Sequence, residues 1–313
     1  MTFARSVKEE LTRIDSSKSM KLAELSALLH LSGEVVYNKE GLFIEFTSSN
    51  IAITRRFVSL VKELYDAEVD LFKKEGSNLK KSGMLVIIKS HTKQIANEHS
   101  LLDDNTYDYD LLTASNEEKQ AYLKGAFLAR GSVNDPIKPN YHLEIFTKSK
   151  NEAIYVQRLM NHFDLNARIT KRRNGLIIYI KEAEAISEFL KVIGAYDSVF
   201  KYEDLRIQRD FNNSINRVIN CEIANEKKTL DAANNQLLQI KLIKQYKDID
   251  SLDSKTREII LLREENPNSS LNELALAYEQ KTGDKMSKSG INHRLVKIRE
   301  LALDIVEQIK EGQ

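Results

Sequence analysis

Apolar residues recur in this 313-residue chain in two long stretches that share one order of elements. Residues 25–33 form a small, apolar segment, and a matching segment covers residues 123–131. Each is followed by an apolar run typical of a buried strand, at residues 42–47 and 143–147. This separation is longer than the ~20–50 residues of stacked repeat arrays. We therefore predict two pseudo-symmetric halves of one domain rather than a solenoid.

The two copies continue with matching elements after these strands. Residues 51–65 and 151–163 are predicted helices. Residues 84–88 and 176–180 are predicted strands, each of which follows a glycine and leads into another helix. Each copy is thus predicted to be a helix–strand–strand–helix–strand–helix unit.

Small residues lie along one face of both repeated helices. They are Ser26, Ala27 and Gly33 in the first copy, and Gly125, Ala126, Ala129 and Gly131 in the second. Small side chains let two helix backbones approach closely, so we expect the two helices to pack against each other at the pseudo-twofold axis. The closing glycine of each segment also fits the left-handed conformation that often ends a helix.

After the duplicated region the apolar spacing becomes helical throughout. We predict a duplicated domain at residues 1–204, with halves of about 1–104 and 105–204, a helical linker at 205–250, and a three-helix unit at 251–313. The linker carries an apolar stripe at helical spacing: Phe211, Ile215, Val218, Ile219 and Ile223. In the last unit, Ser270 and Glu273 form a predicted capping box, and Ser287 is predicted to cap the third helix.

The third helix of the last unit carries the clearest binding chemistry. Between Lys285 and Arg299 there are five Lys or Arg residues and no Asp or Glu. Cations offset phosphate charge, and Asn and Arg can pair with base edges, so this helix is a predicted DNA-recognition helix. A solvated basic helix in an ordinary bundle would show the same pattern. The residues predicted to bind DNA are Lys288, Ser289, Asn292, His293, Arg294, Lys297 and Arg299. We assign Asn292 and His293 to base edges, and Lys288, Arg294, Lys297 and Arg299 mainly to phosphates.

Composition restricts the location and the class of the protein. The formal net charge is only +1, so nucleic-acid binding must depend on local patches. No apolar run approaches the ~18–20 residues of a membrane span. The single cysteine, Cys221, excludes an intramolecular disulfide, and we expect it to be buried. We predict a cytoplasmic, nucleoid-associated protein without membrane contact.

No ionisable residues are spaced as a catalytic or metal-binding site requires. The histidines show no metal-ligand spacing with Cys or carboxylates, and there is no phosphate-binding Gly-rich loop. His30 lies inside the first repeated helix and is predicted to be a core or interface residue. We expect no catalytic residue, metal or cofactor, and hence no enzyme.

The paired helices resemble the LAGLIDADG motif of homing endonucleases. In that family each helix carries an acidic metal ligand just before the closing glycine, and the matching positions here are Ser32 and Arg130. A hydroxyl is a poor lone ligand for Mg²⁺, and a guanidinium repels the cation. Glu34 follows the first glycine, but its counterpart is Ser132. The resemblance implies the endonuclease fold without its cleavage chemistry.

A closer resemblance is to the WhiA family of bacterial transcription regulators. It rests on residues 122–133, 141–145, 218–225 with Lys228 and Thr229, and 287–295. It implies an α+β fold, in which a duplicated αββαββα LAGLIDADG-like domain precedes an all-α helix-turn-helix domain. The implied role is control of sporulation or cell division. The implied partners are double-stranded DNA at promoter sites and other transcription or division proteins.

Two other functions stay open beside a sequence-specific transcription regulator. One is a surviving metal-dependent DNA endonuclease that uses unpaired acids such as Glu34, and the other is a protein-interaction module in cell division or chromosome segregation. The duplicated domain could also contact DNA itself, through Arg55 and Arg56 or through residues 171–173 on its sheet surface.

Overall fold

A computed structural model describes residues 2–39, 41–74, 83–102 and 109–311 of the chain. Its internal contacts divide the chain into two compact units, Met1–Asp210 and Phe211–Gln313, which we call unit 1 and unit 2. No helix among the described residues has both the length and the apolar composition needed to cross a membrane.

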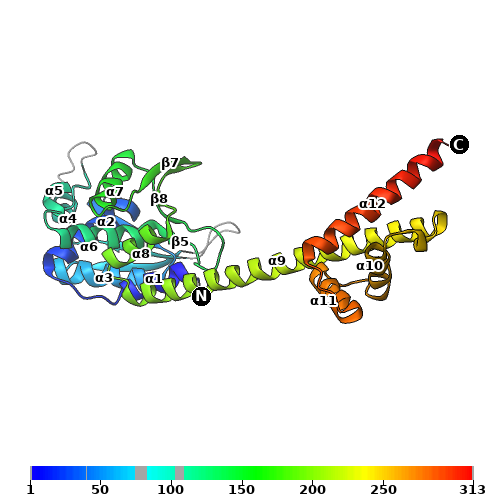
Figure 1. The fold of residues 1–313 in the computed structure, drawn as a ribbon. Coiled ribbons are helices and arrows are strands. Elements are labelled where there is room, and N and C mark those ends of the chain that lie inside the picture. The colour runs from blue at the N-terminus through cyan, green and yellow to red at the C-terminus, as the bar shows by residue number, and fades with distance from the viewer. Residues whose placement is uncertain (1, 40, 75–82, 103–108, 312–313) are drawn as a thin grey trace. The chain divides into compact units, whose positions relative to one another are not determined.

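Unit 1 contains the order αββαββα twice (Figure 1). The first copy comprises α2 (Lys18–Ser32), β1 (Gly33–Asn38), β2 (Gly41–Ser48), α3 (Ile51–Tyr65), β3 (Val69–Lys74), β4 (Gly83–Ile88) and α4 (Thr92–Glu98). The second comprises α6 (Asn116–Arg130), β5 (Gly131–Val133), β6 (Leu143–Thr147), α7 (Lys150–His162), β7 (Arg168–Arg172), β8 (Gly175–Ile180) and α8 (Ala183–Val192). Helices α1 (Phe3–Leu11) and α5 (Tyr109–Leu112) precede the two copies. The predicted α+β class and the duplication are confirmed.

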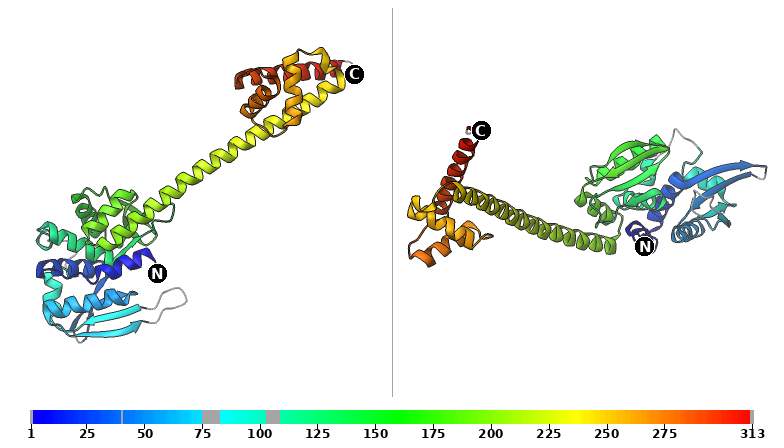
Figure 2. Two further views of the ribbon diagram at one scale, coloured as in Figure 1. Left: turned by 60° about the horizontal axis from the view of Figure 1, so that its bottom comes forward. Right: turned by 90° about the vertical axis from the view of Figure 1, so that its right-hand side faces the viewer.

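Each half of unit 1 has its own four-stranded antiparallel sheet, and Figure 2 shows the two sheets as separate layers. The strand orders are equivalent, β1-β2-β4-β3 and β5-β6-β8-β7. Along β2, Ile44 and Phe46 are buried while Glu45 points to the opposite face, as the two-residue period of a strand requires. One face of each sheet thus faces the shared core of unit 1, and the other is open.

Helices α2 and α6 lie side by side, as the small residues predict (Figure 1). A Cβ added to Gly125 would lie 2.4 Å from the carbonyl oxygen of Glu24 and 2.8 Å from Cβ of Ala27, so the close approach requires glycine. The predicted left-handed ends are wrong, because Gly33 and Gly131 are extended, with φ of −86° and −76°. A side chain there would clash with the preceding helical turn, since the chain passes directly from helix to strand.

A buried ion cluster joins the central helices. Glu24 on α2 is fully buried and accepts hydrogen bonds from Nε and Nη2 of Arg56 at 2.9 and 2.7 Å. Nζ of Lys124 on α6 lies 2.8 Å from the same carboxylate. Arg56 therefore does not line the sheet surface, because Glu24 holds it in the interior, where an unpaired carboxylate would be costly.

Unit 2 is entirely helical. Helix α9 (Tyr196–Tyr246) begins in unit 1 and ends in unit 2, and a 3₁₀ turn (Ile249–Ser251), α10 (Ser254–Glu265), α11 (Leu271–Thr282) and α12 (Lys288–Glu311) follow. Both predicted caps are present: Ser270 and Glu273 form a capping box, and Oγ of Ser287 accepts a bond from the backbone N–H of Gly290 at 3.1 Å. Gly283 ends α11 in the left-handed conformation, with φ of 77°.

The predicted apolar stripe of residues 211–223 is helical but exposed. Phe211 and Ile223 are 65% and 58% exposed, and Cys221 is exposed as well, so its predicted burial is wrong. Burial on α9 resumes only further along, first at Ala233 and then at Ile240 and Ile243, which enter the core of unit 2. Helical spacing alone does not reveal whether a surface packs against the stripe.

Candidate nucleic-acid interface

The seven predicted DNA-binding residues all lie in the first half of α12. Ile291, Leu295 and Ile298 are buried and fix the inner side of the helix. At 100° per residue, the seven side chains divide into two flanks and an outward face. One flank carries Lys288, Asn292 and Arg299, the outward face carries Ser289 and His293, and the other flank carries Arg294 and Lys297.

Two of these cations already have an anionic partner. Nη1 of Arg294 and Nζ of Lys297 lie 3.0 and 2.8 Å from the carboxylate of Asp253. Asp253 is the N-cap of α10 and accepts a bond from the backbone N–H of Thr256 at 3.1 Å. The hydrogen bond from Lys297 is the main cause that holds the pKa of Asp253 well below its usual range. Phosphate must therefore compete with Asp253 for this flank.

The opposite flank borders a pocket of about 270 Å³, which we call the α9–α12 pocket. Lys288 and Asn292 of α12 line it together with Lys228 of α9 and Arg263 of α10. The sequence predictions missed Arg263, and Lys228 entered them only through the family resemblance. Neither residue carries a local signal of its role, because the pocket joins helices that are far apart along the chain.

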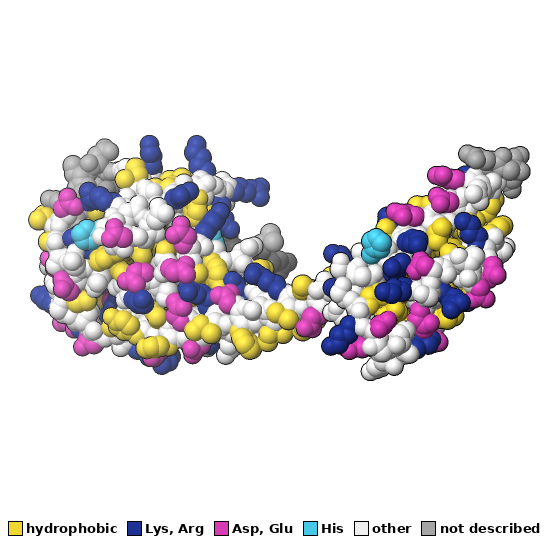
Figure 3. Space-filling view, viewed as in Figure 1, with side chains coloured by type: hydrophobic (Ala, Val, Ile, Leu, Met, Phe, Trp, Pro, Cys, Tyr) yellow, Lys and Arg dark blue, Asp and Glu magenta, His cyan; other side chains and the backbone are white. Residues whose placement is uncertain are grey.

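Acidic residues limit the basic surface to the start of α12. Glu300, Asp304 and Glu307 follow Arg299 and lie on the outward side of the helix, at the same angles as Ser289 and His293. Figure 3 shows Lys and Arg side chains gathered on this part of unit 2, with Asp and Glu side chains toward the C-terminal end of α12. Only the first three turns are therefore suited to contact a polyanion.

Cationic side chains occupy the C-terminal ends of both central helices of unit 1, α2 and α6, whose last residues are Ser32 and Arg130. Nε of Arg130 donates to the carbonyl of Leu31 on α2 at 3.1 Å. Nζ of Lys8, from α1, donates to the carbonyl of Leu128 on α6 at 3.1 Å. Burial, and secondly Arg130, lowers the pKa of Lys8 to about 8. Cations at these helix ends offset the negative end of the helix dipole.

This donor set does not fit a divalent metal ion. Among the described residues, no three His, Cys, Asp or Glu side chains are grouped closely enough to hold one. Ser32 offers only a single hydroxyl as a ligand, and the adjacent guanidinium of Arg130 repels a metal cation. Lys8 entered the sequence predictions only through the family resemblance and without a role, because it acts on a carbonyl 120 residues away.

The open faces of the two sheets carry different charges. In the first half, Glu34, Glu45 and Asp70 lie in one row across β1, β2 and β3, with Ile87 between the last two. The corresponding row of the second half is Ser132, Glu144, Tyr179 and Arg168. The acidic row disfavours contact between the first sheet and a phosphate backbone.

The basic candidates of unit 1 are only partly on its sheet surface. Lys171 and Arg172 lie on the edge strand β7, and Nη1 of Arg172 is 2.6 Å from the carboxylate of Glu144. Arg55 is exposed on α3, not on a strand. The second half thus has a small basic edge that is partly neutralised within the domain.

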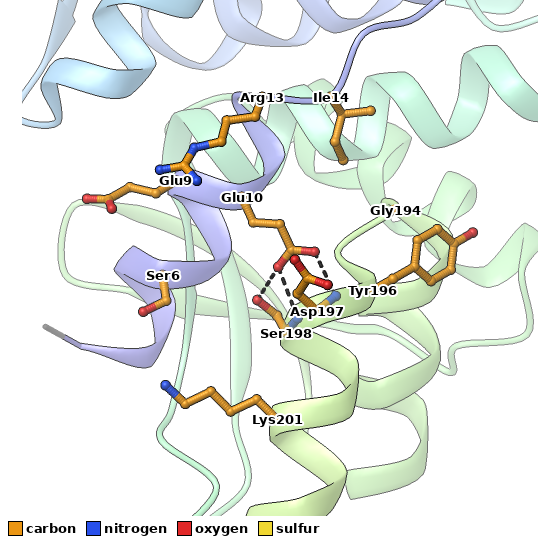
Figure 4. Close-up of a pocket in the computed structure, with 10 residues that line it drawn as sticks. All are labelled: Ser6, Glu9, Glu10, Arg13, Ile14, Gly194, Tyr196, Asp197, Ser198 and Lys201. Atoms are coloured by element: carbon orange, nitrogen blue, oxygen red, sulfur yellow. Dashed lines mark hydrogen bonds between the residues drawn. The ribbon is translucent and has the colours of Figure 1, made fainter.

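A second cavity, of about 530 Å³, lies between α1 and the first turn of α9 (Figure 4). Glu10 of α1 points to the start of α9, where its carboxylate accepts bonds from the backbone N–H groups of Asp197 and Ser198 at 2.9 and 3.0 Å. The hydroxyl of Ser198 donates to the same carboxylate at 2.5 Å. Glu10 therefore caps the long helix, which gives this region a structural role.

The buried histidines form a structural network. The ring of His30 lies 2.8 Å from the hydroxyl of Tyr122 and 2.6 Å from the carbonyl of His99. The ring of His99 lies 2.6 Å from Oγ of Ser26 and 2.9 Å from the hydroxyl of Tyr65. Burial, assisted by His30, lowers the pKa of His99 to about 3. His30 is thus a helix-interface residue, as predicted.

Comparisons with known proteins cover the whole chain. Three family models match: the WhiA N-terminal LAGLIDADG-like domain at residues 18–102, the WhiA LAGLIDADG-like domain at 119–212, and the WhiA C-terminal HTH domain at 215–302. A probable cell division protein WhiA from Oceanobacillus iheyensis is 42% identical over 319 residues, which covers 100% of this chain and 99% of that protein. Its counterpart from Staphylococcus haemolyticus is 41% identical over 317 residues, with 100% and 99% covered.

One solved structure shares the fold over nearly the full length. The crystal structure of full-length WhiA from Thermatoga maritima matches with a TM-score of 0.59 and 24% sequence identity. The match covers 97% of this chain and 99% of that one.

Proposed function

This chain belongs to the WhiA family, and from that premise we propose that it is a sequence-specific DNA-binding regulator of transcription, acting in cell division or sporulation. Unit 2 binds promoter DNA through the first half of α12. Unit 1 is an endonuclease-type scaffold that does not cut DNA. Its Ser32, Arg130 and Lys8 lie where cleavage would need anionic metal ligands.

The observation that carries this proposal is the composition of α12. Its first three turns present cations, amide and imidazole groups with no carboxylate among them, and its inner side is fixed by a helical core. Asn292 and His293 are exposed near the helix start, where recognition helices contact base edges. Lys288 and Arg299 contact phosphates from one flank, and Arg294 and Lys297 from the other.

Replacing Asn292 by Ala should relax sequence preference. An amide that reads a base edge contributes about 1–3 kcal/mol of discrimination, whereas phosphate contacts contribute to all sequences alike. Selection from a random pool of duplexes with the wild type and with Asn292→Ala measures this change. A variant that weakens every sequence equally, with the preference intact, would show that Asn292 does not read bases.

The same proteins also test the nuclease alternative. Wild type incubated with plasmid and Mg²⁺ or Mn²⁺ is expected to leave the plasmid intact. Clean cutting that is abolished by Glu34→Gln would establish the nuclease instead.

A protein-interaction role in the division machinery is the competing proposal, and the exposed apolar stripe at residues 211–223 favours it. In that case, replacing Asn292 and Arg294 by Ala would leave the cellular phenotype of wild type unchanged. The DNA-binding proposal requires that the double variant behave as a loss of function. Genome-wide mapping of bound sites for both proteins would accompany the phenotypes.

A further inference from the structure

The α9–α12 pocket contains a buried cation with no anionic partner in the described part of the chain. The side chain of Arg263 is 1% exposed and lines this pocket. Its Nη1 donates to the carbonyl of Ser269 at 2.6 Å, but its Nε has no hydrogen-bond partner. A buried charge that neither an ion pair nor a full set of hydrogen bonds compensates destabilises the fold. An anion in the pocket would supply the missing partner.

Several other lining residues are suited to the same ligand, whereas the buried Oε1 of Gln236 is an acceptor that has no hydrogen-bond partner among the described residues. Lys228 from α9 and Lys288 from α12 add two further cations, and Thr229 adds a hydroxyl. No Asp or Glu is among the described residues that line the pocket. Three cations with polar donors are the usual surroundings of a phosphate group.

The start of α11 completes the wall of the pocket. Its first two residues, Leu271 and Asn272, line the pocket, so the positive end of the helix dipole lies beside it. The carboxylate of Glu273, in the same turn, is held in the capping box, where it accepts a bond from the backbone N–H of Ser270 at 2.6 Å. Glu273 is the acidic residue closest in sequence to this wall, and the capping box already holds its carboxylate.

We propose that the α9–α12 pocket binds a backbone phosphate of duplex DNA, and that Lys228 and Thr229 thereby make α9 part of the DNA interface. This inference rests on the proposed function. In helix-turn-helix complexes the recognition helix begins at the bases while the preceding helix crosses the backbone, and the pocket lies between the starts of these two helices. Lys288 and Asn292 belong both to the pocket and to the predicted interface, which favours a DNA phosphate over a free anion.

The test uses the salt dependence of DNA binding by the full-length chain. The logarithm of affinity falls with the logarithm of salt concentration by about 0.9 per phosphate contact. Fluorescence anisotropy with a mixed-sequence duplex should therefore show a slope that is smaller by about 1 in Lys228→Ala than in wild type. Lys228→Arg should restore the wild-type slope. The matched control is Lys227→Ala, because Lys227 is the adjacent exposed residue of α9 and does not line the pocket.

Each result that would contradict the proposal has a different meaning. If wild type binds and Lys228→Ala and Lys227→Ala give equal slopes, the pocket does not hold a DNA phosphate. If wild type binds no duplex at low salt, the proposed function fails and this inference fails with it. Thermal unfolding with inorganic phosphate at constant ionic strength addresses the free anion. Stabilisation of wild type but not of Lys228→Ala, with unchanged DNA slopes, would assign the pocket to a small anion and overturn the proposal.

Discussion

Asp253 determines how much of the positive charge on α12 is free of an anionic partner within the chain, and thus available to the DNA of the proposed function. Its carboxylate binds Arg294 and Lys297 while it caps α10, so one residue couples the stability of the helical core of unit 2 to the predicted DNA-binding surface. Exposed ion pairs contribute little to stability. Their larger consequence here is competition, because each cation held by Asp253 is less available to a phosphate.

Replacing Asp253 by Asn should strengthen DNA binding without loss of the helix cap. Asn caps helices about as well as Asp, but it carries no charge to hold the two cations. We expect tighter binding to all duplexes and a salt slope that is steeper by up to about 2, since two phosphate contacts become available. Fluorescence anisotropy at several salt concentrations measures both quantities.

The control for this change is Asp250→Asn. Asp250 is ion-paired with Arg257 and contacts neither Arg294 nor Lys297. An Asp253→Asn protein that binds like wild type would mean that this flank of α12 does not face phosphate.

Unit 1 should lose stability in mildly acidic solution because of His99. The folded pKa of about 3 lies below the ordinary value of 6.5, so between these values the unfolded chain binds a proton that the folded chain excludes. Stability is therefore fully present above pH 6.5 and falls as the pH is lowered toward 3. Between pH 6.5 and 5 the loss from this residue should be about 1–2 kcal/mol.

Urea unfolding of wild type and His99→Gln at both pH values measures this contribution. The variant removes the titrating ring and keeps a side chain that can form hydrogen bonds. Its free energy of unfolding should change less between the two pH values than that of wild type. Parallel pH dependence of the two proteins would show that His99 does not control acid sensitivity.

At the scale of elements, α9 is a structural part of unit 2. Ile240 and Ile243 lie in the same core as Ile260 of α10 and Ile291 of α12. A three-helix fragment without α9 would expose this core and lose Lys228. The C-terminal part of α9 therefore stabilises unit 2 as well as connecting it to unit 1.

A fragment of residues 211–313 should fold, whereas a fragment of residues 251–313 should not. Burial of Leu- or Ile-sized side chains contributes about 1.5–3 kcal/mol each, and the shorter fragment loses two such residues together with Ala233. Circular dichroism during thermal unfolding compares the two. A cooperative transition in the shorter fragment at the temperature of the longer one would contradict this role of α9.

At the scale of the whole molecule, the two halves of unit 1 keep equivalent elements but not equivalent surfaces. The central helices still meet through Gly125, yet the first open sheet face carries Glu34 and Glu45 while β7 of the second carries Lys171 and Arg172. Symmetric binding of a DNA duplex by both sheets is therefore disfavoured. The proposed function accordingly assigns DNA recognition to unit 2.

The sequence by itself determined the secondary structure, the duplication, the contact between the central helices and the caps at Ser270 and Ser287. The helices, the strands and the caps depend on residues within a few positions of one another, so periodicity and capping chemistry reveal them. The duplication and the helix contact are revealed by a pattern of small and apolar residues that the sequence repeats. The closing glycines were predicted for the wrong reason. Close packing and a left-handed turn both require glycine, so the sequence does not distinguish them. Cys221 was misplaced because helical spacing does not show what lies beside a helix.

Only the tertiary structure decided which charges are available. Lys297 meets an acid 44 residues away, and Lys8 meets a carbonyl 120 residues away. Arg263 and Lys228 line the same pocket, which residues 269–272 and the start of α12 help to build. Whether a cation faces solvent, a carboxylate or a helix end depends on contacts between distant segments, and these arise only when the helices pack.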